Sequence, residues 1–94
     1  MRPSHLFSLS GPLRWREFDG EWVVFSVATG ALRHVDTLTA AVLAMLEDAP
    51  ATAASVAQQV AAASEVTLSD EMISGVVALL DDLRRNGFLE CGDL

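Results

Sequence analysis

The dipeptide Asp19-Gly20 lies between two short segments rich in Trp, Phe and Val, and it constrains the fold more than any other feature of this chain. Asp and Gly tolerate the positive φ angles of a two-residue type I′ turn, whose twist matches that of paired antiparallel strands. Residues 13–18 and 21–27 are therefore predicted to form a β-hairpin. Trp15, Trp22 and Phe25 then belong to one small sheet.

A second turn is predicted at residues 28–30, where Gly30 can adopt the left-handed conformation that closes a three-residue hairpin loop. Residues 31–35 then form a third strand, and the three strands make an antiparallel meander. The third strand lies at an edge of this sheet, with unpaired N–H and C=O groups along one side.

Three helices are expected after the sheet, because apolar residues then recur at helical spacing. The first helix begins after Asp36 and ends before Pro50, and the second opens at Thr52. The third opens at Ser69 and ends with Gly87 at the C′ position. The order of elements, strands first and helices after, gives the class α+β. The apolar arc of the third helix is wider than a surface helix needs, so this face either packs on both sheet and helices or is partly exposed.

Composition and charge narrow the choice of partners. The chain has 94 residues, enough for one domain, and thirteen Asp and Glu residues against six Arg give a formal net charge of −7. Phosphate backbones repel such a chain, so nucleic acid is not an expected partner. The acidic balance either keeps the protein soluble or favours a basic partner. No apolar run approaches the roughly 20 residues that span a bilayer, so no membrane partner is expected.

The sequence predicts a single domain with a short segment at each end. Residues 1–10 are expected to form a flexible N-terminal arm, residues 11–91 the single domain, and residues 92–94 a frayed C-terminus. The arm has no signal-peptide pattern, so a cytoplasmic location is expected. The single cysteine, Cys91, has no partner for an internal disulfide, and the two His residues do not provide zinc-binding spacing. Neither a metal nor another cofactor is predicted.

Catalysis is not expected, although Ser26, His34 and Asp36 are the residue types of a hydrolytic triad. The chain has no nucleophile elbow, no Gly-rich phosphate loop and no carboxylate pair at a predicted cleft. The edge of the third strand favours binding instead. A peptide that pairs with residues 31–35 would gain main-chain hydrogen bonds, and its alternate side chains would reach the apolar third helix. Strand edge and helix together predict a peptide groove.

Four segments together resemble the PqqD-like peptide chaperones, also called RiPP precursor peptide recognition elements. These segments are residues 13–25, 28–30, 34–43 and 79–89. Within the family, the pattern is most similar to the branch found with HPr-kinase-related proteins. The resemblance implies a winged helix-turn-helix domain in which a three-stranded antiparallel sheet is followed by three helices, and it implies that the chain is not an enzyme.

The resemblance also implies a function in natural product biosynthesis. Family members bind the leader segment of a ribosomally synthesised precursor peptide by strand addition and present it to a modifying enzyme, here an HPr-kinase-related one by the branch resemblance. Two positions depart from the pattern: Thr37 stands where the family often has Pro, and His34 where the branch prefers an aliphatic residue. Carried over by position, the peptide-binding residues are Leu32, Arg33, His34, Val35, Met72, Val76, Leu79 and Leu83.

Two other functions are compatible with the same fold. A winged-helix DNA-binding regulator would insert the start of the third helix into the major groove, which brings Asp70 and Glu71 toward phosphates and leaves Arg84 and Arg85 at the other end. A structural partner module would instead bury the strand edge and the apolar helix against another protein, or against a second copy in a homodimer.

Overall fold

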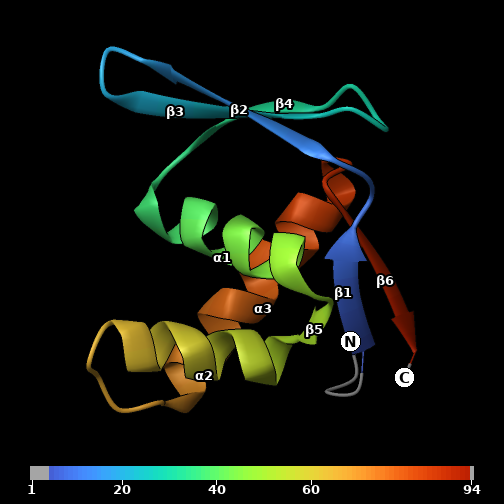
Figure 1. Ribbon diagram of the computed structural model, residues 1–94. Coiled ribbons are helices and arrows are strands. Elements are labelled where there is room, and N and C mark those ends of the chain that lie inside the picture. Colours follow the sequence, from blue (N-terminus) through green and yellow to red (C-terminus); the bar gives the residue numbers. More distant parts are fainter. Residues whose placement is uncertain (1–4, 94) are drawn as a thin grey trace.

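The computed structural model describes residues 5–93, and within them the chain forms three helices and two three-stranded antiparallel sheets (Figure 1). The first sheet consists of β2 (Leu13–Phe18), β3 (Glu21–Ser26) and β4 (Leu32–Val35), in that order. Asp19 and Gly20 have φ angles of 51° and 81°, so the predicted type I′ turn between β2 and β3 is confirmed.

The loop between β3 and β4 is longer than predicted. The N–H of Ser26 donates to the carbonyl of Ala31 at 2.8 Å, so the loop contains the four residues 27–30 rather than three. Gly30 occupies its last position with a φ of 77°, and this left-handed conformation was predicted. The extra residue changes which β4 side chains face the helices, because side chains alternate along a strand.

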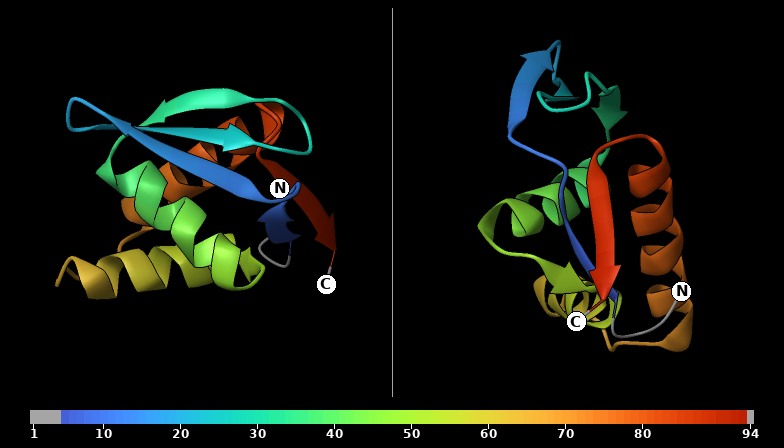
Figure 2. Two further views of the ribbon diagram at one scale, coloured as in Figure 1. Left: turned by 45° about the horizontal axis from the view of Figure 1, so that its top comes forward. Right: turned by 90° about the vertical axis from the view of Figure 1, so that its right-hand side faces the viewer.

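The first sheet has one covered face and one open face. Paired residues of neighbouring strands share a face, so Arg33 and Val35 of β4 lie on the same face as the buried Val24 of β3. Phe25 and Leu32 form a pair on the opposite, exposed face. Figure 1 shows the sheet above the helices, and the right-hand view of Figure 2 shows no other described element on its outer face.

A second sheet was not predicted. It has the order β5-β1-β6, with β1 at His5–Leu9, β5 at Ala51–Thr52 and β6 at Leu89–Asp93. The strand count of the predicted fold is therefore wrong, while the α+β class is confirmed. Residues 5–9 lie in the central strand rather than in a flexible arm, because Phe7 is fully buried in the core.

The C-terminal end also differs from the expectation. Gly92 and Asp93, expected to be frayed, pair with β1 in the structure, as do the residues after Phe88. Residues 89–93 together form β6, which lies antiparallel to β1. Residues 1–4 and 94, which were assigned to the arm and the frayed end, lie outside the described residues.

The three helices follow the predicted boundaries: α1 spans Thr37–Asp48, α2 spans Ala53–Ala63 and α3 spans Asp70–Arg85. Each begins where a side-chain oxygen accepts a hydrogen bond from a first-turn N–H, which satisfies a donor that the helix itself cannot pair. The confirmed caps are Asp36 to Thr39 at 2.7 Å, Thr52 to Ser55 at 3.2 Å, and Ser69 to Met72 at 3.2 Å.

The end of α3 is a Schellman motif, as its sequence indicated. Gly87 has a φ of 89°, its N–H donates to the Arg84 carbonyl at 3.2 Å, and the N–H of Phe88 donates to the Leu83 carbonyl at 3.0 Å. The motif turns the chain directly into β6. The N–H of Ser10 then donates to the carbonyl of Phe88 at 3.0 Å, which joins the start of β6 to the end of β1.

The core lies between the two sheets and the three helices. Its largest fully buried side chains come from both sheets and all three helices: Phe7, Val24, Val42, Leu43, Val56, Leu80, Leu83 and Phe88. On α3, Val76, Leu80 and Leu83 are buried, whereas Met72 and Leu79 are only half-buried. The wide apolar arc of this helix is therefore partly in the core and partly exposed.

We predict that Gly75→Ala stabilises the protein by about 0.5–1 kcal/mol, because Gly in a helix loses more backbone entropy on folding than Ala does. Apart from the adjacent residues and the backbone of the helix itself, no atom of the described residues lies within 4 Å of the position that the new Cβ would occupy. Thermal unfolding should show a Tm higher by roughly 2–8 °C. As a control, Gly87→Ala should lower the Tm, because its φ is positive and its Cβ would lie 3.0 Å from Thr29 Oγ1. An unchanged or lower Tm for Gly75→Ala contradicts the prediction.

A second prediction concerns the cap of α1. The N–H of Thr39 donates to the Asp36 carboxylate and is the main cause of the lowered pKa of Asp36. A lowered folded-state pKa adds stability above the ordinary Asp pKa, and this stability is lost as the pH falls through the lowered value. Asp36→Ala should therefore cost about 1 kcal/mol at neutral pH and less below about pH 4.

Urea denaturation at several pH values measures this difference, and Ser69→Ala provides the control, since the serine cap of α3 does not titrate. The cost of Ser69→Ala should not follow the same pH dependence. An Asp36→Ala cost that stays constant down to acid pH would show that the ionised carboxylate is not what stabilises the helix.

Candidate functional site

The free edge of β4 is the first part of the candidate site. Among residues 5–93, β4 pairs only with β3, and β4 ends the strand order of the first sheet. Hydrogen-bonded and non-hydrogen-bonded pairs alternate in antiparallel strands, and the Ser26–Ala31 pair is hydrogen-bonded. Arg33 therefore bonds to β3, while Leu32 and His34 direct their N–H and C=O groups to the free edge. An added strand would pair with these two residues.

A stripe on α3 is the second part. Met72, Gly75, Leu79 and Asp82 follow each other at spacings of three and four residues, so they share one face of the helix. Met72 and Leu79 are half-buried, and Gly75 leaves open space between them. We call the free edge of β4 together with this stripe the β4–α3 surface.

An ion pair connects the two parts. The guanidinium of Arg33 on β4 donates to the carboxylate of Asp82 on α3 at 2.7 Å, and the two side chains are 29% and 53% exposed. A hydrogen bond at 2.8 Å from the Thr29 hydroxyl to the Gly87 carbonyl also holds the β3–β4 loop against the end of α3. These two contacts join β4 and the β3–β4 loop to the C-terminal end of α3. Asp82 was missing from the predicted site, and only its charge, opposite to that of Arg33, could have indicated it.

The structure distributes the eight sequence-predicted site residues among three environments. The side chains of Leu32 and His34 are exposed on the outer face of the first sheet, and Leu32 is 68% exposed. Arg33 and Val35 are half-buried on the helix-facing side, and Met72 and Leu79 are half-buried on the stripe. Val76 and Leu83 are in the core, where they pack α3 in place and do not face the surface.

The residues considered for a triad are not assembled. Ser26 is fully buried, and its hydroxyl has no hydrogen-bond partner within the described part of the chain. His34 points to the opposite face of the sheet, where its Nδ1 lies 3.8 Å from Oε2 of Glu21. The carboxylate of Asp36 caps α1. The three groups therefore do not form a nucleophile–base–acid relay.

The charges of α3 are arranged as predicted. Asp70 and Glu71 lie in its first turn, where the helix dipole favours acids, and Arg84 and Arg85 lie in its last turn. Both arginines pair with Asp81, at 2.7 Å and 2.8 Å, and the hydrogen bond from Arg84 is the main cause of the lowered pKa of Asp81. The start of α3 thus carries two acids, which disfavour its insertion into a DNA groove.

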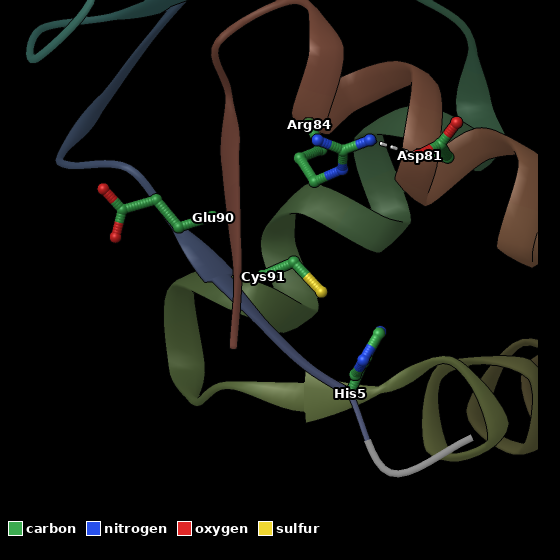
Figure 3. Close-up of a pocket in the computed structure, with 5 residues that line it drawn as sticks. All are labelled: His5, Asp81, Arg84, Glu90 and Cys91. Carbon is green, nitrogen blue, oxygen red and sulfur yellow. Dashed lines mark hydrogen bonds and ion pairs between the residues drawn. The ribbon is translucent and has the colours of Figure 1, made fainter. Parts of the chain in front are cut away.

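A cavity of about 720 Å³ lies beside β1, β6 and the last turns of α3. Its lining residues are His5, Asp81, Arg84, Glu90 and Cys91 (Figure 3). In Figure 3 the Cys91 thiol and the His5 ring reach the space between the elements, whereas Glu90 points away and Asp81 is bound by Arg84. The cavity has no residue in common with the β4–α3 surface.

Two further properties concern the described residues alone. Within residues 5–93, no group of three or more His, Cys, Asp or Glu side chains could hold a metal ion. None of the helices described here is long and apolar enough to cross a bilayer.

Comparison with known proteins gives one match. The family model described as "Coenzyme PQQ synthesis protein D (PqqD)" matches residues 21–89, a segment from β3 to the first residue of β6. The chain matches no curated protein and no solved structure. The matched segment covers well over half of the chain and contains both parts of the β4–α3 surface. Proteins of this family are non-catalytic accessory partners in peptide-modifying biosynthesis. The chain therefore belongs to the PqqD family, as the resemblance of its hairpin and last helix indicated.

Proposed function

We propose that this protein is a peptide chaperone that binds the leader segment of a ribosomally synthesised precursor peptide by strand addition and presents it to a separate modifying enzyme. The observation that carries the proposal is the free edge of β4 beside the half-buried stripe of α3, in a chain of the PqqD family. A winged helix-turn-helix arrangement, an HPr-kinase-related enzyme and a cytoplasmic location belong to the same proposal.

The backbone of β4 would supply the affinity. An added strand pairs with the outward N–H and C=O groups of Leu32 and His34, and each such bond replaces one to water. Its alternate side chains point toward the helix-facing side, where Met72 and Leu79 are accessible. Specificity would then come from how well these side chains fit the stripe on α3.

The role of the bound protein would be positioning. In this proposal the protein holds the precursor, and the separate enzyme carries out the modification. Holding the leader near that enzyme raises the effective concentration of the reacting segment of the precursor. A homodimer formed through the β4 edge would compete with the same peptide, so leader binding should decrease any self-association.

Calorimetry gives the first test of the proposed function. Titration with the N-terminal segment of a short precursor encoded beside this gene should give micromolar or tighter affinity, and Leu79→Glu should abolish it by placing a charge on the stripe. Leu38→Glu is the matched control, because Leu38 is an exposed Leu on α1. No binding by a folded, monomeric wild-type protein, or equal losses for both variants, contradicts the proposal.

His34→Pro tests strand addition separately. Proline removes an N–H that faces the free edge, and proline is tolerated on such an edge. His34→Ala is the control because it removes the imidazole and keeps the N–H. Calorimetry should show much weaker leader binding for His34→Pro and little change for His34→Ala. Equal affinities for the two variants would exclude pairing at this edge.

The ion pair between Arg33 and Asp82 gives a third test. Asp82→Asn should reduce leader affinity severalfold, because β4 loses its ion pair with the C-terminal part of the α3 stripe. The free energy of unfolding should change by less than about 1 kcal/mol, since the pair is partly exposed. Asp81→Asn, which breaks pairs within α3 only, should leave leader affinity unchanged. If both variants bind the leader as the wild type does, the ion pair does not organise the site.

A further inference from the structure

A second cavity lies on the helix-facing side of the first sheet, where Trp15 of β2 and Trp22 of β3 line it. It has a volume of about 430 Å³ and lies between the β2–β3 hairpin and α1. Its lining is aromatic and apolar except for one carboxylate: Trp15, Trp22, Ala40, Ala44 and Glu47. Ala40, Ala44 and Glu47 follow at spacings of four and three residues on one face of α1, and the two small alanines leave room under the hairpin.

The two indole rings are held nearly at right angles. Their centroids are 6.3 Å apart and the angle between the ring planes is 81°. The indole N–H of Trp15 donates to Oε2 of Glu47 at 3.3 Å, which fixes one ring and the carboxylate relative to each other. Trp22 is 43% exposed, so a ligand can reach its ring from solvent. A large aromatic side chain with this exposure lacks a full set of packing partners.

The charge around this cavity is negative. Glu17 lies opposite Trp22 in the strand register and so shares its face, which adds a second carboxylate beside the rings. Arg14 and Arg16 lie on the other face of β2, because side chains alternate along the strand. No basic residue is among the described residues that line the cavity. Indole faces and carboxylates both attract cations, and neither attracts an anion.

We propose that this cavity binds a cationic side chain, Arg or Lys, presented by the surface of the modifying enzyme. The net charge of −7 draws a basic protein surface toward this chain. An enzyme that docks at the β2 edge leaves the β4 edge free for the precursor, because the two strands are opposite edges of one sheet. The inference that the cationic side chain comes from the modifying enzyme rests on the proposed function. The inference that the cavity prefers a cation does not.

The test uses two small probes and the intact protein. Acetyl-Gly-Arg-Gly-amide carries the cation, and acetyl-Gly-citrulline-Gly-amide is a neutral probe of nearly the same shape. In NMR titrations of the ¹⁵N-labelled protein, the Arg peptide should shift both indole N–H signals and bind at least about threefold more tightly than the citrulline peptide, the size expected of one partly exposed cation–π contact. Equal affinities, or no shift of either indole signal, overturn the proposal.

Substitutions in the cavity show whether the Arg peptide binds there. Glu47→Gln and Trp22→Leu should each weaken the Arg peptide at least threefold. The matched controls are Glu21→Gln and Phe25→Leu. Both residues are on β3, as Trp22 is, but on its outer face, so these substitutions should not change the affinity for the Arg peptide. Glu47→Gln keeps both indole rings, so it remains informative if Trp22→Leu does not fold. Equal losses for variants and controls would show that the probe does not bind in this cavity.

A last measurement, of leader-peptide binding, distinguishes a failure of the cation site from a failure of the proposed function. Glu47→Gln should leave affinity for the leader peptide unchanged within about twofold. A large loss of leader affinity would mean that the precursor supplies the cation, which overturns the enzyme as its source. If the wild type binds the Arg peptide but no leader, the proposed function fails while the cation site stands.

Discussion

The register between β3 and β4 is the constraint on which the rest of the structure depends. Because Ser26 pairs with Ala31, Arg33 faces the helices and reaches Asp82, while Leu32 and His34 present their backbone groups to the free edge. A shift of one residue would exchange these roles, since it turns every β4 side chain to the other face. The four-residue loop thus determines which groups a partner peptide can reach.

The second sheet packs against the helices and so helps to hold α3 in place beside the first sheet. β1 is central in it, and Phe7 and Phe88 from β1 and from the turn before β6 are buried in the common core. The Schellman motif at Gly87 joins α3 to β6 without an intervening loop, and the same glycine accepts the hydrogen bond from Thr29. The end of α3 is therefore fixed both to the second sheet and to the loop that sets the β4 register. Surfaces built on such fixed elements lose little entropy when they bind a ligand.

Features that depend on adjacent residues were predicted from the sequence, whereas strand pairing between distant segments was not. The type I′ turn, the three N-caps and the end of α3 each depend on a few adjacent residues, and all were predicted. β1 was missed because five residues with mixed pattern become a strand only through partners at residues 51–52 and 89–93. Val76 and Leu83 lie on the apolar face of α3, as helical spacing indicates. Helical spacing does not show which residues of this face are buried in the core and which are accessible to a peptide. Asp82 and the Trp-lined cavity depend on contacts across the tertiary fold.

Amide hydrogen exchange measured by NMR would show whether a leader peptide adds as a strand to the free edge of β4, as we propose. Peptide binding should slow exchange at the N–H groups of Leu32 and His34, while those of Arg33 and Val35, which already bond to β3, should change little. We expect this alternating pattern of protection along β4. Tight binding without added protection at Leu32 and His34, or with protection confined to another element, would contradict it.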